Sequence, residues 1–371
     1  MRTSLRLLCS AAVLGLPMTA GAAAAAPAIP TLGDIFKASG ITEAGYVDAS
    51  WNYNNRQYDA APLSYGGANV NSFALNQVGL MLTKLPAEGF GGAVDLLGGH
   101  DAAGVPSDGG GDVIFKQAFI QYATGGLTLI GGRFVTLAGS EVINDSQNSN
   151  ATRSLLFFYQ PLVHTGVRGS YKFNDMLTVV AGANNSTGFG GAGAVVNDTN
   201  EQKTGELSFA LTPKDGISIA LTGYKGTEAP GQSPLLVDLV VSVQATKALS
   251  LGVNADHLDY DAGPAPGASK TKTDGAAVYA NFQLTDALRA GARGEYVTTK
   301  NFGVGVDRKQ KEVTLTTDYA ASSAFDLLAD VRYDKDDSSP FFSAFDTSGP
   351  PVFTSAKDSM VTVVLKAIYK F

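Results

Sequence analysis

The stretch MVTVVLKAIYKF, from Met360 to Phe371, decides the fold class of this chain. Every second residue counted back from Phe371 is apolar, whereas Lys370, Lys366 and Thr362 lie on the other parity. This two-residue period is typical of a β-strand with one apolar and one polar face. A strand that closes a membrane barrel has this pattern, because lipid covers its apolar face and the first strand pairs with its edge. A soluble sandwich or a solenoid is the alternative, and its apolar face would need a second layer to cover it.

The composition favours many short strands joined by turns. The 371 residues include 43 glycines, and 16% of the residues are charged. After residue 30, no stretch approaches the roughly 18 consecutive apolar residues that a transmembrane helix needs. Contact with a membrane must therefore come from alternating strands.

Residues 1–26 have the layout of a cleaved secretory signal peptide, with a short membrane anchor as the alternative. Arg2 and Arg6 precede an apolar core, and the segment ends in small residues. Cys9, the single cysteine, lies within it, so the mature chain would contain no disulfide, thiol nucleophile or cysteine-bound metal. Removal of the segment leaves 25 basic and 34 acidic residues, a formal charge of −9, which argues against a nucleic-acid partner.

The rest of the chain divides into a short periplasmic lead-in, residues 27–39, and a transmembrane β-barrel, residues 40–371. From Gly40 onward, strands of about ten residues are joined alternately by tight turns and by longer polar connections. The tight turns fall at Pro86–Gly89, Ala123–Gly126, Asn174–Asp175, Pro213–Gly216, Thr246–Lys247, Thr285–Asp286 and Ala321–Ser323. With a first strand near Ile41–Tyr53 and the terminal strand, the pattern predicts an all-β, antiparallel up-and-down barrel of about sixteen strands, with fourteen or eighteen as alternatives.

Short turns on the periplasmic side and long loops outside are the asymmetry of a bacterial outer-membrane barrel. The longest predicted connections are Thr136–Leu162 and Lys335–Ala356. Two segments alternate poorly. Apolar residues occupy both faces of 114–122, and in 127–134 a bulge at Gly131 and Gly132 would explain why Arg133 has the parity of Leu127.

Several segments also resemble a known family. GYVDASWNYN (Gly45–Asn54), NSFALNQVGLML (Asn71–Leu82), GFGGAVDLLGG (Gly89–Gly99), GGRFVTLAGSEVI (Gly131–Ile143) and HTGVRGSY (His164–Tyr171) are similar to the OmpL-like β-barrel porins, the porin-2 group of bacterial outer-membrane proteins. The resemblance runs from about Gly40 to Phe371 and is more specific in the first half. It implies a channel in the outer membrane whose solutes are poorly defined.

We therefore expect passive diffusion of small hydrophilic solutes or ions, with a non-transporting structural or adhesive barrel as the alternative. An enzyme is not expected, because His100, His164 and His257 are far apart and have no second ligand at metal spacing. His164 is expected to be a hydrogen-bonded structural residue. No cofactor and no metal ion is expected.

The connection Thr136–Leu162 is predicted to fold back into the barrel, because it joins polar SEVINDSQNSNATR to apolar SLLFFYQP, and an apolar end is costly in solvent. It would form a constriction at which opposed charges set a transverse field. The alternative is that these charges only hydrate a polar lumen. The predicted pore residues are Glu141, Asp145 and Arg153 on the connection and Arg168, Arg289, Arg293, Asp330 and Arg332 on the wall.

The expected partners follow from the membrane location. They are membrane lipid, lipopolysaccharide, small hydrophilic solutes and the outer-membrane assembly machinery, which would read Tyr369 and Phe371 as a terminal signal by strand addition. A homotrimer is possible, with no interface evident in the sequence.

Overall fold

The computed structural model describes residues 31–55, 71–107, 112–188, 198, 201–228, 233–261, 270–302, 306–338, 342–346 and 352–371. It separates into two compact units, Met1–Gly40 and Ile41–Phe371. The predicted signal peptide and the first residues of the predicted lead-in lie outside the described residues.

The first unit contains one short helix, α1 (Leu32–Ser39). The side chain of Thr31 accepts a hydrogen bond from the backbone N–H of Asp34 at 3.2 Å, and the carboxylate of Asp34 accepts one from the N–H of Thr31 at 2.9 Å. This capping box begins the helix, and Gly40, in a left-handed conformation with φ 68°, ends it. No residue of α1 is buried. Among the described residues, no helix is both long and apolar enough to cross a bilayer.

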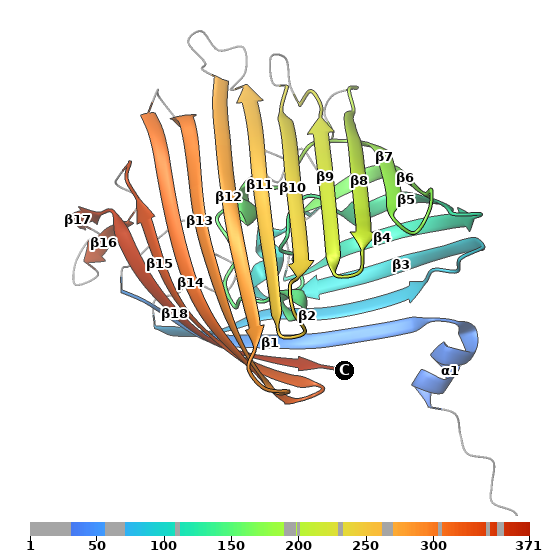
Figure 1. Ribbon diagram of the computed structural model, residues 1–371, viewed down its shortest axis with the longest axis horizontal. Coiled ribbons are helices and arrows are strands. Elements are labelled where there is room, and N and C mark those ends of the chain that lie inside the picture. Colours follow the sequence, from blue (N-terminus) through green and yellow to red (C-terminus); the bar gives the residue numbers. More distant parts are fainter. Residues whose placement is uncertain are drawn as a thin grey trace, which may run out of the picture. The chain divides into compact units, whose positions relative to one another are not determined.

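The second unit is a closed antiparallel barrel (Figure 1). In the described part of the chain it contains sixteen strands, which confirms the number predicted from the turns. Consecutive strands are neighbours from β1 to β15, and β18 closes the ring between β15 and β1. The strands are β1 (Thr42–Asn54), β2 (Ser72–Lys84), β3 (Gly89–Gly98), β4 (Val113–Thr124), β5 (Leu127–Val135), β6 (Val163–Lys172), β7 (Leu177–Asn184), β8 (Thr204–Lys214), β9 (Ile217–Lys225), β10 (Leu235–Gln244), β11 (Leu249–Asp261), β12 (Lys270–Gln283), β13 (Leu288–Phe302), β14 (Val306–Ser322), β15 (Phe325–Asp336) and β18 (Ser359–Lys370).

The closing pair is the one that the terminal sequence predicts. β18 runs antiparallel to β1, with Trp51 opposite Leu365. Beyond the strand end, the N–H of Phe371 donates to the carbonyl of Gly45 at 2.9 Å and the N–H of Gly45 donates back at 2.8 Å. The ladder therefore continues to the last residue, and the barrel has no free sheet edge.

The two faces of each strand differ as the alternation predicts. On β15 and β18, Val331 and Leu365 are 54% and 50% exposed, whereas Asp330 and Arg332 on the other face are fully buried. Apolar side chains thus point out of the barrel and charged ones point into it, as expected for a wall between lipid and a polar interior.

The seven predicted tight turns all lie at one end of the barrel, and the long connections lie at the other. One long connection differs from the expectation of a loop. Between β15 and β18 it contains a two-stranded hairpin, β16 (Phe342–Asp346) and β17 (Val352–Lys357), which is separate from the barrel sheet.

The two poorly alternating segments have different explanations. In β4 the register against β3 shifts between Asp95 and Leu96, so that Lys116 is an extra residue, and this bulge gives both faces apolar positions. The pairing of β5 is continuous on both sides, so the bulge expected at Gly131 and Gly132 is absent. Arg133 does share the parity of Leu127, and its guanidinium donates to the carbonyl of Pro106.

Candidate functional site: the interior loop

The segment Thr136–Leu162 lies inside the barrel, as predicted, and is called the interior loop from here on. It contains two short 3-10 helices, η3 (Asp145–Gln147) and η4 (Leu156–Tyr159), and leaves the wall between β5 and β6. Figure 1 shows it within the ring of strands. Its contacts reach β13, which is eight strands from β5 in either direction around the ring. The loop therefore crosses the full width of the lumen.

The apolar end of the loop packs against the inner wall. Leu155 and Leu156 are buried in a cluster with Ala277 and Tyr279 of β12 and Val297 of β13. On the other side, Phe157 packs with Ile143 of the loop and with apolar residues of β3, β4 and a third 3-10 helix, η2 (His100–Gly104). Burial of these side chains explains why an apolar segment follows the polar part of the loop.

Arg293 of β13 holds the loop at the far wall. Its guanidinium donates to Glu141 at 2.7 Å and to the carbonyl of Thr152 at 2.8 Å, both on the loop. It also lies 3.1 Å from Glu312 and 3.2 Å from Glu295 on the wall. The guanidinium is buried, so one cation is shared among three carboxylates.

Asp145 forms a second attachment, near β18, β1 and β2. Its carboxylate pairs with Arg153 of the loop and with Lys366 of β18, and Lys366 lies 3.0 Å from Asp48 of β1. Gln77 of β2 donates to Asp145 at 3.1 Å and accepts from its N–H at 3.2 Å. All five side chains are buried, so this network is fully inside the barrel.

Asp330 and Arg332 of β15 complete the attachment. Asp330 accepts hydrogen bonds from the N–H and the hydroxyl of Thr152, at 2.8 and 2.9 Å. Arg332 donates to the carbonyl of Arg153 and to Asp334, the latter at 2.6 Å. Six of the eight predicted pore residues therefore belong to the contact between the loop and the wall.

Arg168 and Arg289 lie apart from that contact. Arg168 of β6 forms an ion pair with Glu206 of β8 at 2.6 Å, and Arg289 of β13 pairs with Asp318 of β14 at 2.6 Å. Among the described residues, neither makes an ion pair with a residue of the interior loop. Their role as pore residues stays a prediction.

The predicted constriction has opposed charges on the two sides of an open gap. The structure differs from this prediction in one respect. Most acidic and basic groups of the loop are paired at ion-pair distance with groups of opposite sign and are removed from water. Removing one partner of a buried ion pair typically costs about 3–5 kcal/mol. These charges therefore fix the position of the loop, and Lys366, Asp48, Glu295 and Glu312 were not among the predicted site residues.

Asp145 has a pKa below its ordinary value. Burial alone would raise the pKa of this carboxyl, but the charges of Arg153 and Lys366 outweigh burial and lower it. Nearby Asp101 of η2, which accepts a hydrogen bond from Gln77, has a raised pKa, because it is buried and lies near Asp145. On acidification Asp101 therefore takes up a proton first and relieves the repulsion on Asp145.

We expect the interior loop to stay in place at acid pH. A carboxyl with a lowered pKa contributes stability above its unfolded value of about 4 and loses it only as the pH falls through the lower folded value. Single-channel conductance, corrected for the bulk conductivity, should therefore be unchanged between pH 7 and about pH 4.5. A stepwise rise in conductance within that range would contradict the assignment of Asp145 as an ionised attachment.

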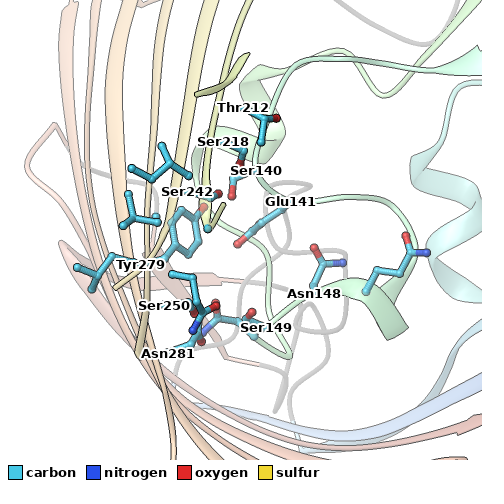
Figure 2. A pocket seen from close by; sticks show the side chains of 18 residues that line it. Ser140, Glu141, Asn148, Ser149, Thr212, Ser218, Ser242, Ser250, Tyr279 and Asn281 are labelled. Atoms are coloured by element: carbon cyan, nitrogen blue, oxygen red, sulfur yellow. The ribbon is translucent and has the colours of Figure 1, made fainter. Parts of the chain in front are cut away.

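A cavity of about 450 Å³ lies between the interior loop and the wall from β8 to β12, toward the short turns. Figure 2 shows Ser140, Glu141 and Asn148 on the loop side and Ser242 and Tyr279 on the wall side. A second cavity of about 290 Å³ lies between the loop and β2 to β5. Glu141 and Gln147 line both cavities, so the polar part of the loop separates them.

The three histidines do not lie together in a common site. His164 is buried, stacks on Tyr224 with ring centroids 4.7 Å apart, and makes a hydrogen bond through Nδ1 to the carbonyl of Ser186 at 3.2 Å. This confirms a hydrogen-bonded structural position. In the part of the chain that the structure describes, no group of three or more His, Cys, Asp or Glu residues could hold a metal ion.

Closed antiparallel barrels of sixteen strands occur among outer-membrane porins. The anion-selective porin from Comamonas acidovorans has a similar fold, with a TM-score of 0.61 and 14% identity, covering 89% of this chain and 99% of that one. The outer-membrane channel DcaP of Acinetobacter baumannii has a TM-score of 0.60 and 13% identity, covering 89% and 97%. OprB of Pseudomonas putida has a TM-score of 0.59 and 11% identity, covering 91% and 96%. At these identities the likeness shows the fold.

The family is shown by sequence. A model of the family described as "Putative beta-barrel porin-2, OmpL-like" matches residues 40–371, and the chain belongs to that family. This confirms the resemblance found in its motifs and identifies a channel of the bacterial outer membrane. A comparison with curated proteins found no matching relative.

Proposed function

We propose that the protein lets small hydrophilic solutes and ions diffuse passively across the outer membrane, and that the interior loop is its constriction. The observation that carries the proposal is the path of the loop, which runs from β5 to β13 on the far side of the ring. Sixteen strands enclose an aqueous lumen, and a loop across that lumen reduces its open section.

The predicted pore residues have two parts in this proposal. One group holds the loop in place through the ion pairs and hydrogen bonds of the contact with the wall. The other group places charge on the wall outside that contact. The first group is Glu141, Asp145, Arg153, Arg293, Asp330 and Arg332, and the second is Arg168 and Arg289.

Deletion of Ser140–Asn150 should raise the single-channel conductance in planar bilayers, because it removes the part of the loop that separates the two cavities. Single-channel events report only inserted molecules, so a lower yield of the variant does not affect the comparison. Equal conductance of the variant and the wild type would contradict a constriction here. A folded wild-type barrel without any conductance would instead favour a structural or adhesive role.

We further propose that the protein has no catalytic activity. The described histidines lie in separate places, His164 being held by Ser186 and His257 lying 2.6 Å from Asp274 at the long-loop end of the barrel. No serine or threonine hydroxyl is hydrogen-bonded to either of these rings among the described residues.

Lipopolysaccharide is the proposed partner at the long-loop end. On the lipid-facing side of the wall, Lys272 of β12 is directly opposite Lys300 of β13. Like charges directly opposite each other in a sheet are destabilising. Asp259 of β11 lies 3.7 Å from Lys272, and an anionic lipid phosphate beside Lys300 would balance the second charge. Loss of co-purifying phosphorylated lipid in a variant with both lysines changed to glutamine would support this partner, and its full retention would contradict it.

Three further assignments complete the proposal. Residues 1–26 act as a cleaved signal peptide, and residues 27–39 precede the barrel in the periplasm. The chain forms a homotrimer, for which the trimer form of Vibrio cholerae OmpT, with 14% identity and a TM-score of 0.59, is a precedent in the same fold. The molecular mass of the protein in detergent distinguishes a trimer from a monomer.

A further inference from the structure

The cavity of about 450 Å³ between the interior loop and the wall from β8 to β12 is lined mainly by uncharged side chains that can form hydrogen bonds. On the loop it is lined by Ser140 and Ser149, and on the wall by Ser218, Ser242, Ser250 and Asn281. Figure 2 shows these side chains on both sides of the cavity. The volume falls within the roughly 300–1,000 Å³ of small-molecule sites.

The polar groups of these six side chains can form hydrogen bonds to a bound molecule. Among the described residues, none of the five hydroxyls and neither end of the Asn281 amide makes a side-chain hydrogen bond. Each hydroxyl can donate one bond and accept two, and an amide can donate two and accept two. The cavity therefore offers both donors and acceptors from opposite sides to whatever occupies it.

The cavity also lacks an available charge. Among its described lining residues, Glu141 is the charged one, and its carboxylate accepts bonds from Arg293 at 2.7 Å and from the N–H of Ser154 at 2.7 Å. The neighbouring part of the wall is different. At the same end of the barrel, Arg289 and Asp318 pair at 2.6 Å on β13 and β14, outside the cavity.

We propose that this cavity is a binding site for uncharged polyhydroxylated solutes, namely sugars and polyols. Sugar hydroxyls donate and accept at once, so they match serine hydroxyls and an amide that do the same. The ring of Tyr279 adds apolar surface for a C–H face of the solute. The inference rests on the proposed diffusion channel and names the solute class that the channel retains longest.

A matched set of solutes tests the selectivity. Glucose, gluconate and glucosamine have similar size and hydroxyl content but are neutral, anionic and cationic. Purified full-length protein in liposomes should admit glucose faster than either charged analogue, and glucose should reduce the ion current in planar bilayers in a saturable manner. Equal or faster entry of gluconate or glucosamine, or a current unaffected by glucose, would overturn the proposal. Absence of both ion current and solute entry would overturn the diffusion channel as well.

Variants locate the site. Changing Ser218, Ser242 and Ser250 together to alanine should raise the half-blocking glucose concentration at least about fivefold, as expected for the loss of a net hydrogen bond or more. Ser242→Asp should lower glucose entry and increase the preference for K⁺ over Cl⁻. Ser170→Asp, at an inward-parity position of β6 outside the cavity, is the matched control. The same glucose block in the triple variant and the wild type, with ion current intact, would overturn the assignment.

Discussion

Replacing Arg293 with alanine should release the interior loop and give a larger, noisier channel. The side chain is buried and holds Glu141 and the carbonyl of Thr152 on the loop, together with Glu312 and Glu295 on the wall. Without it, three carboxylates share a low-dielectric region with no cation at the centre. Removing one partner of such a buried network costs about 3–5 kcal/mol, which shifts the balance between docked and released loop by roughly two to four orders of magnitude.

The measurement is single-channel recording in planar bilayers at neutral pH. The variant should show a higher mean conductance and frequent transitions between levels, because the released loop can take several positions in the lumen. Arg289→Ala is the matched control, since it removes the same side chain from the same face of β13 but breaks only the pair with Asp318. If Arg293→Ala and Arg289→Ala behave alike, the loop is not held by Arg293.

Arg293→Lys separates charge from geometry. A lysine retains the positive charge but has one ammonium group, which cannot reproduce the fork of donors that now reaches Glu141 and Glu312. We expect conductance between the wild type and Arg293→Ala. A variant identical to Arg293→Ala would indicate that charge contributes little and that hydrogen-bond geometry holds the loop.

The barrel wall could be predicted from sequence because the alternation of apolar and polar residues within each strand shows which side chains face lipid and which face the lumen. In β15 the parity of Asp330 and Arg332 is enough to place both side chains inside, and the tight turns set the number of strands. Where the alternation of a strand fails, the cause is its pairing with a neighbouring strand. The parity of β4 fails because its extra residue, Lys116, depends on pairing with β3, which the sequence of β4 alone does not contain.

The interior loop was predictable as an element but not in its contacts. The change from polar to apolar residues indicated that it folds inward. Parity placed several cations on the inner wall, among them Arg289 and Arg293, which lie on one strand four residues apart. It could not show that Glu141 meets Arg293, because that pair depends on how a loop of 27 residues crosses the lumen. The sequence places Lys366 on the polar parity of the terminal strand, and its pairing with Asp145 appears only once the barrel is closed.

Deleting Phe371 should reduce assembly in cells severalfold and leave the conductance of inserted channels unchanged. The residue adds two backbone hydrogen bonds to Gly45 at the junction of β1 and β18, and its side chain is 65% exposed on the outside of the barrel. Two exposed hydrogen bonds at the end of a closed ladder contribute about 1–3 kcal/mol, a small share of a barrel with sixteen paired strands. The larger effect is expected where assembly machinery must recognise the free terminal strand before the barrel closes.

Two measurements separate recognition from closure. Heat-modifiable gel mobility of the protein extracted from cell envelopes reports assembly in cells, and the same assay after refolding in detergent reports closure without the machinery. Phe371→Trp keeps an aromatic terminus and is the control. Gly45→Ala is the converse variant, because a Cβ at that position would meet the ring of Phe371 and displace it while the terminal sequence stays intact. We expect the deletion to be defective in cells only and Gly45→Ala to be near the wild type in both assays, because the terminal sequence is intact and the exposed ring can move aside. A deletion that is equally defective in detergent would show that Phe371 acts through closure of the barrel, since no assembly machinery is present there.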